Sequence, residues 1–126
     1  MLKQGAVLLV LAVLLAGCAS TTGTKSSRGS RYVITAEEIA ESSFSDAFQA
    51  IQYLRPGLLD QGQRRDVSLG IAEVQVYVDN VRIGGKESLK SIPASNILQI
   101  EFLRSSEATI RYGSDHSLGA FLIKTR

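Results

Sequence analysis

A polar segment near the end of the chain holds its only histidine, in the order Ser114-Asp115-His116. Serine, aspartate and histidine are the residue types of a nucleophile, an orienting carboxylate and a general base. Catalytic triads bring these three groups together from separate segments, which consecutive residues of one loop rarely achieve. We therefore expect an exposed polar loop here, and we predict a protein that has no catalytic residues and is not an enzyme.

The only cysteine, Cys18, follows an apolar run of twelve uncharged residues from Gly5 to Ala16. A membrane-spanning helix needs about 20 such residues. The apolar region of a secretory signal peptide needs about 7–15, after a short basic region, and Lys3 supplies that charge. The length therefore predicts that residues 1–17 are a signal peptide.

The residues Leu15-Ala16-Gly17-Cys18 resemble the bacterial lipobox. The resemblance implies that the thiol of Cys18 receives a diacylglyceryl group, that cleavage follows Gly17, and that the new amine is acylated, for example with palmitate. Two or more acyl chains anchor a protein stably in a membrane, whereas a single acyl chain binds the membrane only marginally. The alternatives are a chance cysteine in an ordinary signal peptide and a short buried helix. Since no second cysteine exists, an intramolecular disulfide is excluded.

Residues 18–30 are rich in Ser, Thr and Gly and predict a flexible tether behind the lipid. The position after the cysteine is Ala19, and the lack of Asp there resembles the outer-membrane default of Gram-negative lipoproteins. We therefore expect an outer-membrane protein, lipid-anchored and facing the periplasm. The net charge of the whole chain is only +2, so no basic excess indicates a nucleic-acid partner.

Residues 31–126 predict one small α+β domain, because short strands and helices mix without a regular alternation. Thr35 and Glu38 form the pattern of a capping box for a helix over 36–41, and Ser45 is placed to cap a second helix over 46–54. The expected loop is 58–70. The remaining expected elements are strands over 32–35, 74–78, 81–83, 97–103 and 120–125, and short helices over 87–92 and 107–112.

The Asp79-Asn80 pair separates two expected strands, and both residue types tolerate the positive φ of a tight hairpin turn. In the strand over 97–103, alternation places Leu98, Ile100 and Phe102 on one apolar face, which we expect in the core. Glu101 on that strand is expected to pair with Arg104 or to be exposed.

The order of these motifs resembles the plug domain of TonB-dependent outer-membrane receptors over about residues 32–126. Three groups of residues match the family pattern: Tyr77, Val78, Asp79 and Val81; Ile100, Glu101, Leu103 and Arg104; Tyr112, Gly113, Ser114 and Gly119. Ser105-Ser106 stand where the family has Gly-Pro, and Asn80 and Ala120 replace glycines. The resemblance implies a mixed sheet with short helices. A barrel of about 22 strands has no room here, so we expect no transport pore.

The function expected from these observations is binding. The first hypothesis is a lipid-anchored envelope module that contacts another envelope or outer-membrane protein; the alternative is a structural envelope lipoprotein with no ligand. We expect no cofactor and no metal site. Contacts are expected in exposed loops, at Asp79, Asn80, Ser114, Asp115 and His116. An exposed apolar patch beside the loop from Asp60 to Gly70 or beside the Asp79-Asn80 turn would favour the first hypothesis, and a uniformly polar surface would favour the second.

Overall fold

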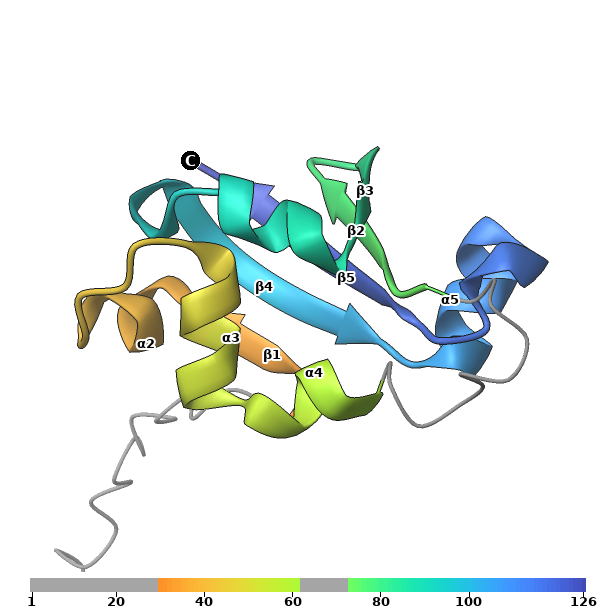
Figure 1. The fold of residues 1–126 in the computed structure, drawn as a ribbon, viewed down its shortest axis with the longest axis horizontal. Coiled ribbons are helices and arrows are strands. Elements are labelled where there is room, and N and C mark those ends of the chain that lie inside the picture. The colour runs from red at the N-terminus through yellow and green to blue at the C-terminus, as the bar shows by residue number, and fades with distance from the viewer. Residues whose placement is uncertain (1–29, 62–72) are drawn as a thin grey trace, which may run out of the picture.

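The computed structural model describes residues 30–61 and 73–126, which form one five-stranded mixed sheet with helices on both faces (Figure 1). The strand order is β1-β4-β5-β2-β3, and every neighbouring pair is antiparallel except β2 and β5, which are parallel. The strands are β1 Val33–Thr35, β2 Gln75–Val78, β3 Val81–Gly85, β4 Ile97–Leu103 and β5 Ala120–Thr125. The predicted α+β class is confirmed.

Short helices connect most of the strands. The α-helices are α2 Ala36–Ala40, α3 Ala47–Leu54, α4 Pro56–Gln61 and α5 Ser105–Tyr112, and the 3₁₀ helices are η1 Lys86–Ser91, η2 Ala94–Asn96 and η3 Ser114–His116. No helix in the described ranges is long and apolar enough to cross a membrane.

The capping box of α2 is confirmed. The Thr35 backbone N–H donates to the Glu38 carboxylate over 3.0 Å, and the Glu38 N–H donates to the Thr35 hydroxyl over 3.4 Å. The cap predicted for α3 is wrong by one residue. The carboxylate of Asp46, not the hydroxyl of Ser45, accepts the N–H of Gln49 over 2.9 Å.

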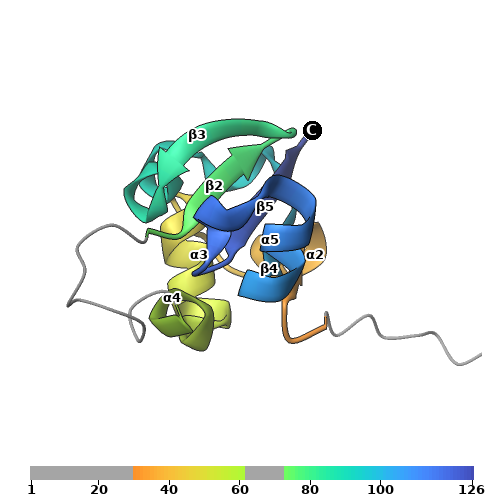
Figure 2. The same ribbon diagram turned by 90° about the vertical axis from the view of Figure 1, so that its right-hand side faces the viewer.

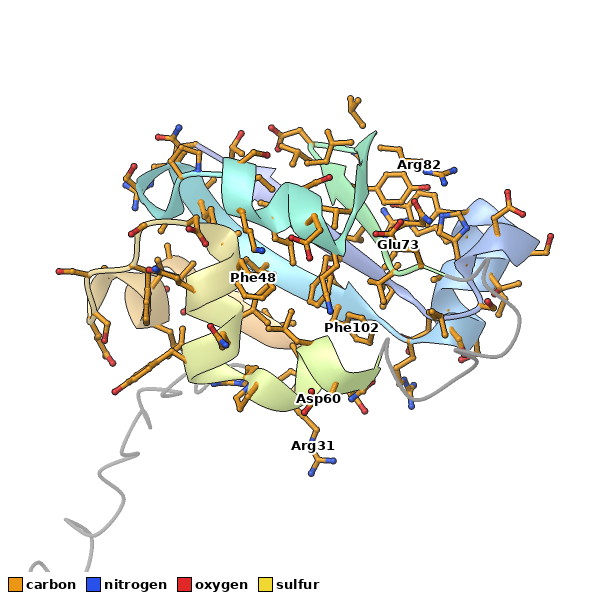
Figure 3. The ribbon with its side chains drawn as sticks, viewed as in Figure 1. Arg31, Phe48, Asp60, Glu73, Arg82 and Phe102 are labelled. Carbon is orange, nitrogen blue, oxygen red and sulfur yellow. The ribbon has the colours of Figure 1, made fainter. Side chains whose placement is uncertain are left out.

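The two faces of the sheet are covered unequally (Figure 2). Helices α2, α3, α4 and η1 cover the first face, and their apolar side chains pack on it around Ile100, Phe102 and Phe121. Phe102 is labelled in Figure 3, near α4. The second face is covered only in part, by α5, whose Ala108 packs on Tyr77, Leu103 and other residues. Part of the second face therefore stays open beside α5.

The predicted core face of β4 is correct for Ile100 and Phe102 but wrong for Leu98, which is 46% exposed. The pairing of β4 with β5 shifts register between Ile97 and Gln99. An irregularity of this kind breaks strict alternation, since one extra residue changes which side chains share a face. As a result Ile97, not Leu98, fills the core at this end of the strand.

The loop predicted over 58–70 is wrong at its start. Pro56 opens helix α4, and its residues Leu58 and Leu59 are buried. Proline suits the first turn of a helix, because its φ is already helical and its missing N–H would have no helical partner there. Residues 62–70 lie outside the described part of the chain. The helical turn expected over 107–112 extends further and is the longer helix α5.

Candidate interaction surface

The Asp79-Asn80 turn forms the tight hairpin predicted between β2 and β3. Both residues have positive φ, 48° and 69°, as such a turn requires. The carboxylate of Asp79 is committed to the fold, because it accepts the Thr125 backbone N–H over 3.0 Å and also the Thr125 hydroxyl. Its own N–H donates to the Ile123 carbonyl over 2.9 Å. Asn80 is exposed and therefore remains available for contacts.

The two hydrogen bonds from Thr125 lower the pKa of Asp79, the side-chain bond most. A carboxylate whose pKa is lowered by folding adds stability above its unfolded pKa of about 3.9, and this stability is lost as pH falls through the lowered folded pKa.

We therefore expect Asp79→Asn to reduce the free energy of unfolding at pH 7, and the difference from wild type to shrink below about pH 4. Asparagine keeps the tolerance for positive φ, so the comparison isolates the charge. Urea melts from pH 7 down to pH 3 would measure it. A difference that stays constant with pH would contradict this role for the carboxylate.

The prediction that His116 lies in an exposed polar loop is wrong. The His116 side chain is 2% exposed, whereas Ser114 and Asp115 are exposed as predicted. Its Nδ1 lies 3.2 Å from the Gly113 carbonyl, and its Nε2 lies 2.7 Å from the Tyr77 hydroxyl. A carbonyl can only accept, so in neutral imidazole Nδ1–H donates to it and Nε2 accepts from Tyr77. The Nε2 contact thus holds the loop to β2, the Nδ1 bond stays within the loop, and neither nitrogen bonds to Ser114.

Three aromatic rings surround this contact. The Tyr77 and Tyr112 rings stack with centroids 4.3 Å apart, and the His116 ring lies 5.8 Å and 5.4 Å from them. The guanidinium of Arg111 lies 5.4 Å from the centre of the Tyr112 ring. The hydroxyl oxygen of Tyr112 is buried without a hydrogen-bond partner among the described residues. This cluster attaches α5 and the loop after it to the second face of the sheet.

Replacing His116 with Ala should lower the free energy of unfolding by about 2–4 kcal/mol, since it leaves a cavity and an unpaired Tyr77 hydroxyl. Asp115→Ala is the matched control on the same loop and should change it by less than about 0.5 kcal/mol. Denaturant melts of both variants measure the contrast. Equal, small effects would mean that His116 does not hold the loop.

Glu101 is half-buried and does not pair with Arg104. The guanidinium of Arg104 instead lies 2.8 Å from the Glu107 carboxylate, and that carboxylate also accepts the Arg104 backbone N–H at the start of α5. Of the two expectations for Glu101, pairing with Arg104 is therefore wrong.

An apolar strand edge borders the Asp79-Asn80 turn. Strand β3 pairs only with β2, and Val81 and Ile83 on it are 63% and 41% exposed. Between them, Arg82 donates from Nε to the Gln75 amide oxygen over 2.9 Å, and Figure 3 shows its side chain pointing outward near the start of β3. The sequence did not reveal this edge, because exposure of β3 depends on the strand order. The adjacent turn signal is the only local hint.

The predicted lipidation residue Cys18, the predicted signal peptide 1–17 and almost all of the predicted tether 18–30 lie outside the described residues. The described chain begins at Ser30, and exposed Arg31 follows just before β1.

Comparison with known proteins identifies the family. The family model described as "TonB-dependent Receptor Plug Domain" matches residues 24–120. Searches of curated proteins and of solved structures returned no match. The matched range includes strands β1 to β4 and ends at Ala120, the first residue of β5. It also includes the Asp79-Asn80 turn and the aromatic cluster around His116. The chain therefore belongs to the TonB-dependent receptor plug domain family.

Proposed function

We propose that this protein is a lipid-anchored cell-envelope module that binds a partner envelope protein through the β3 edge and the Asp79-Asn80 turn. The observation that carries the proposal is the exposed apolar pair Val81 and Ile83 next to that turn. A uniformly polar surface would instead have favoured the alternative, a structural lipoprotein with no ligand.

The edge of a sheet is a natural docking site. An edge strand presents backbone N–H and C=O groups that have no partner within the sheet, and a segment of another protein can add to them as a further strand. Natural sheets often protect such edges with Lys, Pro or very short strands. Strand β3 spans Val81–Gly85 without either residue, and its one charged side chain, Arg82, is hydrogen-bonded to Gln75. The partner we propose is an extended segment of an outer-membrane or periplasmic protein.

The anchor and the location rest on other features. The plug family is named for receptors of the TonB system, which supports association with the cell envelope. The lipobox-like residues Leu15 to Cys18 support a lipid anchor in the outer membrane, and the Ser/Thr-rich segment behind them supports a tether facing the periplasm. We propose further that the protein acts by non-covalent contact and performs no reaction, since His116 and Ser114 are not arranged as a catalytic pair.

The anchor is tested by Cys18→Ser. We expect the wild-type protein to be processed and to partition into detergent, because acyl chains on Cys18 contribute about 0.8 kcal/mol per buried CH₂. The variant should not be acylated and should stay unprocessed or become water-soluble. Metabolic labelling with a palmitate analogue reads this out directly. Labelling that persists in the variant would contradict the lipid anchor at this residue.

The docking edge is tested by photo-crosslinking in intact cells. A photoreactive residue at Val81 should give one defined crosslinked product, and Val81→Lys with Ile83→Lys should remove the partner from a pull-down. Ile110 on α5 is the matched control, because it is apolar and 87% exposed but lies away from β3. The same products from positions 81 and 110, or none from 81, would contradict the proposal.

A further inference from the structure

A hollow of about 310 Å³ lies on the second face of the sheet, in the part that α5 leaves open. Tyr77 and Leu122 supply its apolar and aromatic surface, and Glu101, Arg111 and Lys124 supply charge. Ligand sites combine apolar surface with a few convergent polar groups. Since about 10–15 Å³ of such space suffices for one water molecule, the hollow has room for a small organic molecule.

The strand register explains why Glu101 and Lys124 reach the same hollow. Glu101 pairs with Leu122 across β4 and β5, and Lys124 lies two residues beyond Leu122 on β5. Residues two apart on a strand point to the same face, so the carboxylate and the ammonium both stand on the open second face. They come from different strands and lie diagonally across the pair, where long side chains are within reach of each other.

Arg111 is positioned from α5 by the aromatic stack. Its guanidinium lies over the Tyr112 ring, and that ring stacks on Tyr77, which lines the hollow. A guanidinium held over an aromatic face gains a cation–π interaction and keeps its planar donors in place for a carboxylate. Less conformational freedom is then lost when an anion binds.

Glu101, Arg111 and Lys124 are in no ion pair among the described residues. The ion pairs among residues 30–61 and 73–126 are Arg55 with Glu38, Lys90 with Glu87, and Arg104 with Glu107. Asp79, which also borders the hollow, is already bonded to Thr125. The hollow therefore carries two cations and two carboxylates, and of the carboxylates only Glu101 has no hydrogen bond from Thr125.

We propose that this hollow binds a compact zwitterion of the amino-acid class with an apolar side chain. The ligand carboxylate lies between Arg111 and Lys124, its ammonium lies at Glu101, and its side chain covers Leu122 and the Tyr77 ring. Charge complementarity carries this assignment, because the hollow offers cations and carboxylates together rather than one sign alone, and Glu101 is the carboxylate that the fold leaves without a Thr125 bond. The site borders the Asp79-Asn80 turn but does not include Val81 or Ile83. The variants used below leave that turn and β3 unchanged, so a failure of this proposal can be told apart from a failure of the docking edge.

The test compares three ligands on the full chain in detergent micelles. L-leucine carries both charges, L-leucinamide lacks the carboxylate, and N-acetyl-L-leucine lacks the ammonium. We expect calorimetry to give a dissociation constant for L-leucine below about 1 mM. Each analogue should bind at least about tenfold more weakly, since each loses one charged hydrogen-bonded contact. No binding of L-leucine in this range, or equal binding of all three ligands, overturns the proposal.

Two variants tie the binding to the hollow. Glu101→Gln should weaken L-leucine binding about tenfold and leave the weak binding of N-acetyl-L-leucine unchanged, because only the ammonium contact is lost. Glu87→Gln is the matched control, since Glu87 is an exposed carboxylate on η1, away from the hollow. A loss of affinity in Glu87→Gln equal to that in Glu101→Gln overturns the assignment.

Discussion

Replacing Phe102 with Ala is expected to lower the free energy of unfolding by about 3–5 kcal/mol. The Phe102 side chain is buried in the first face of the sheet, and its ring lies 4.9 Å from that of Phe121, tilted by 58°. Removing the ring loses its burial and leaves a cavity that the surrounding strands and helices fill only in part. A domain of this size has about 5–15 kcal/mol in total, so the variant should lose a large part of its stability.

The matched control is Leu98→Ala on the same strand. Leu98 is half-exposed beside the register shift, so its truncation should change the free energy of unfolding by less than about 0.5 kcal/mol. Urea melts of the two variants measure the contrast. Similar costs at both positions would mean that the register shift is misplaced and that Leu98 also belongs to the core.

The same strand shows how far alternation predicts burial. Period-two patterning placed Ile100 and Phe102 in the core correctly, because both lie where β4 pairs regularly with β5. It failed at Leu98, because an irregular pairing depends on how two strands distant in sequence fit together. Nothing local in residues 97–103 distinguishes a strand with a shift from one without it.

Helix starts were predictable where a side chain caps the first turn. Thr35 and Glu38 correctly predict the start of α2. The start of α3 was predicted within one residue, because the carboxylate of Asp46 caps it instead of Ser45. The start of α4 was missed, because Pro56-Gly57 also fits a chain reversal. The two apolar residues behind it, Leu58 and Leu59, are the signal that could have indicated a buried helix.

Among the candidate interaction residues, only the turn conformation of Asp79 and Asn80 could be predicted from residue type. Asp79 and Asn80 carry the positive φ that their residue types allow. The contact of His116 with Tyr77 joins positions 39 residues apart, and the polarity of Ser114-Asp115-His116 gave no sign that only the histidine turns inward. Exposure of Val81 likewise depends on the strand order, which places β3 at the edge of the sheet.

Gly119, one of the residues that match the plug pattern, has a structural role that accounts for its type. It precedes β5 with φ +92°, a conformation that L side chains rarely adopt. An added Cβ would also meet the Leu103 carbonyl oxygen, and it would lie 2.8 Å from the Phe102 Cζ atom. The first of these contacts is with backbone, which cannot rotate away as a flexible side chain would.

Gly119→Ala is therefore expected to cost about 2–6 kcal/mol, from about 1–3 kcal/mol of backbone strain and about 1–3 kcal/mol of overpacking. Gly113→Ala at the other end of the same loop is the matched control. Gly113 also has positive φ, +106°, but an added Cβ there meets nothing within 4 Å, so only the strain of about 1–3 kcal/mol applies. Chemical melts of both variants isolate the overpacking as their difference. If Gly113→Ala costs as much as Gly119→Ala, the close approach of β4 to Gly119 does not explain why glycine is needed there. The match to the plug pattern at Gly119 would then reflect its backbone conformation alone.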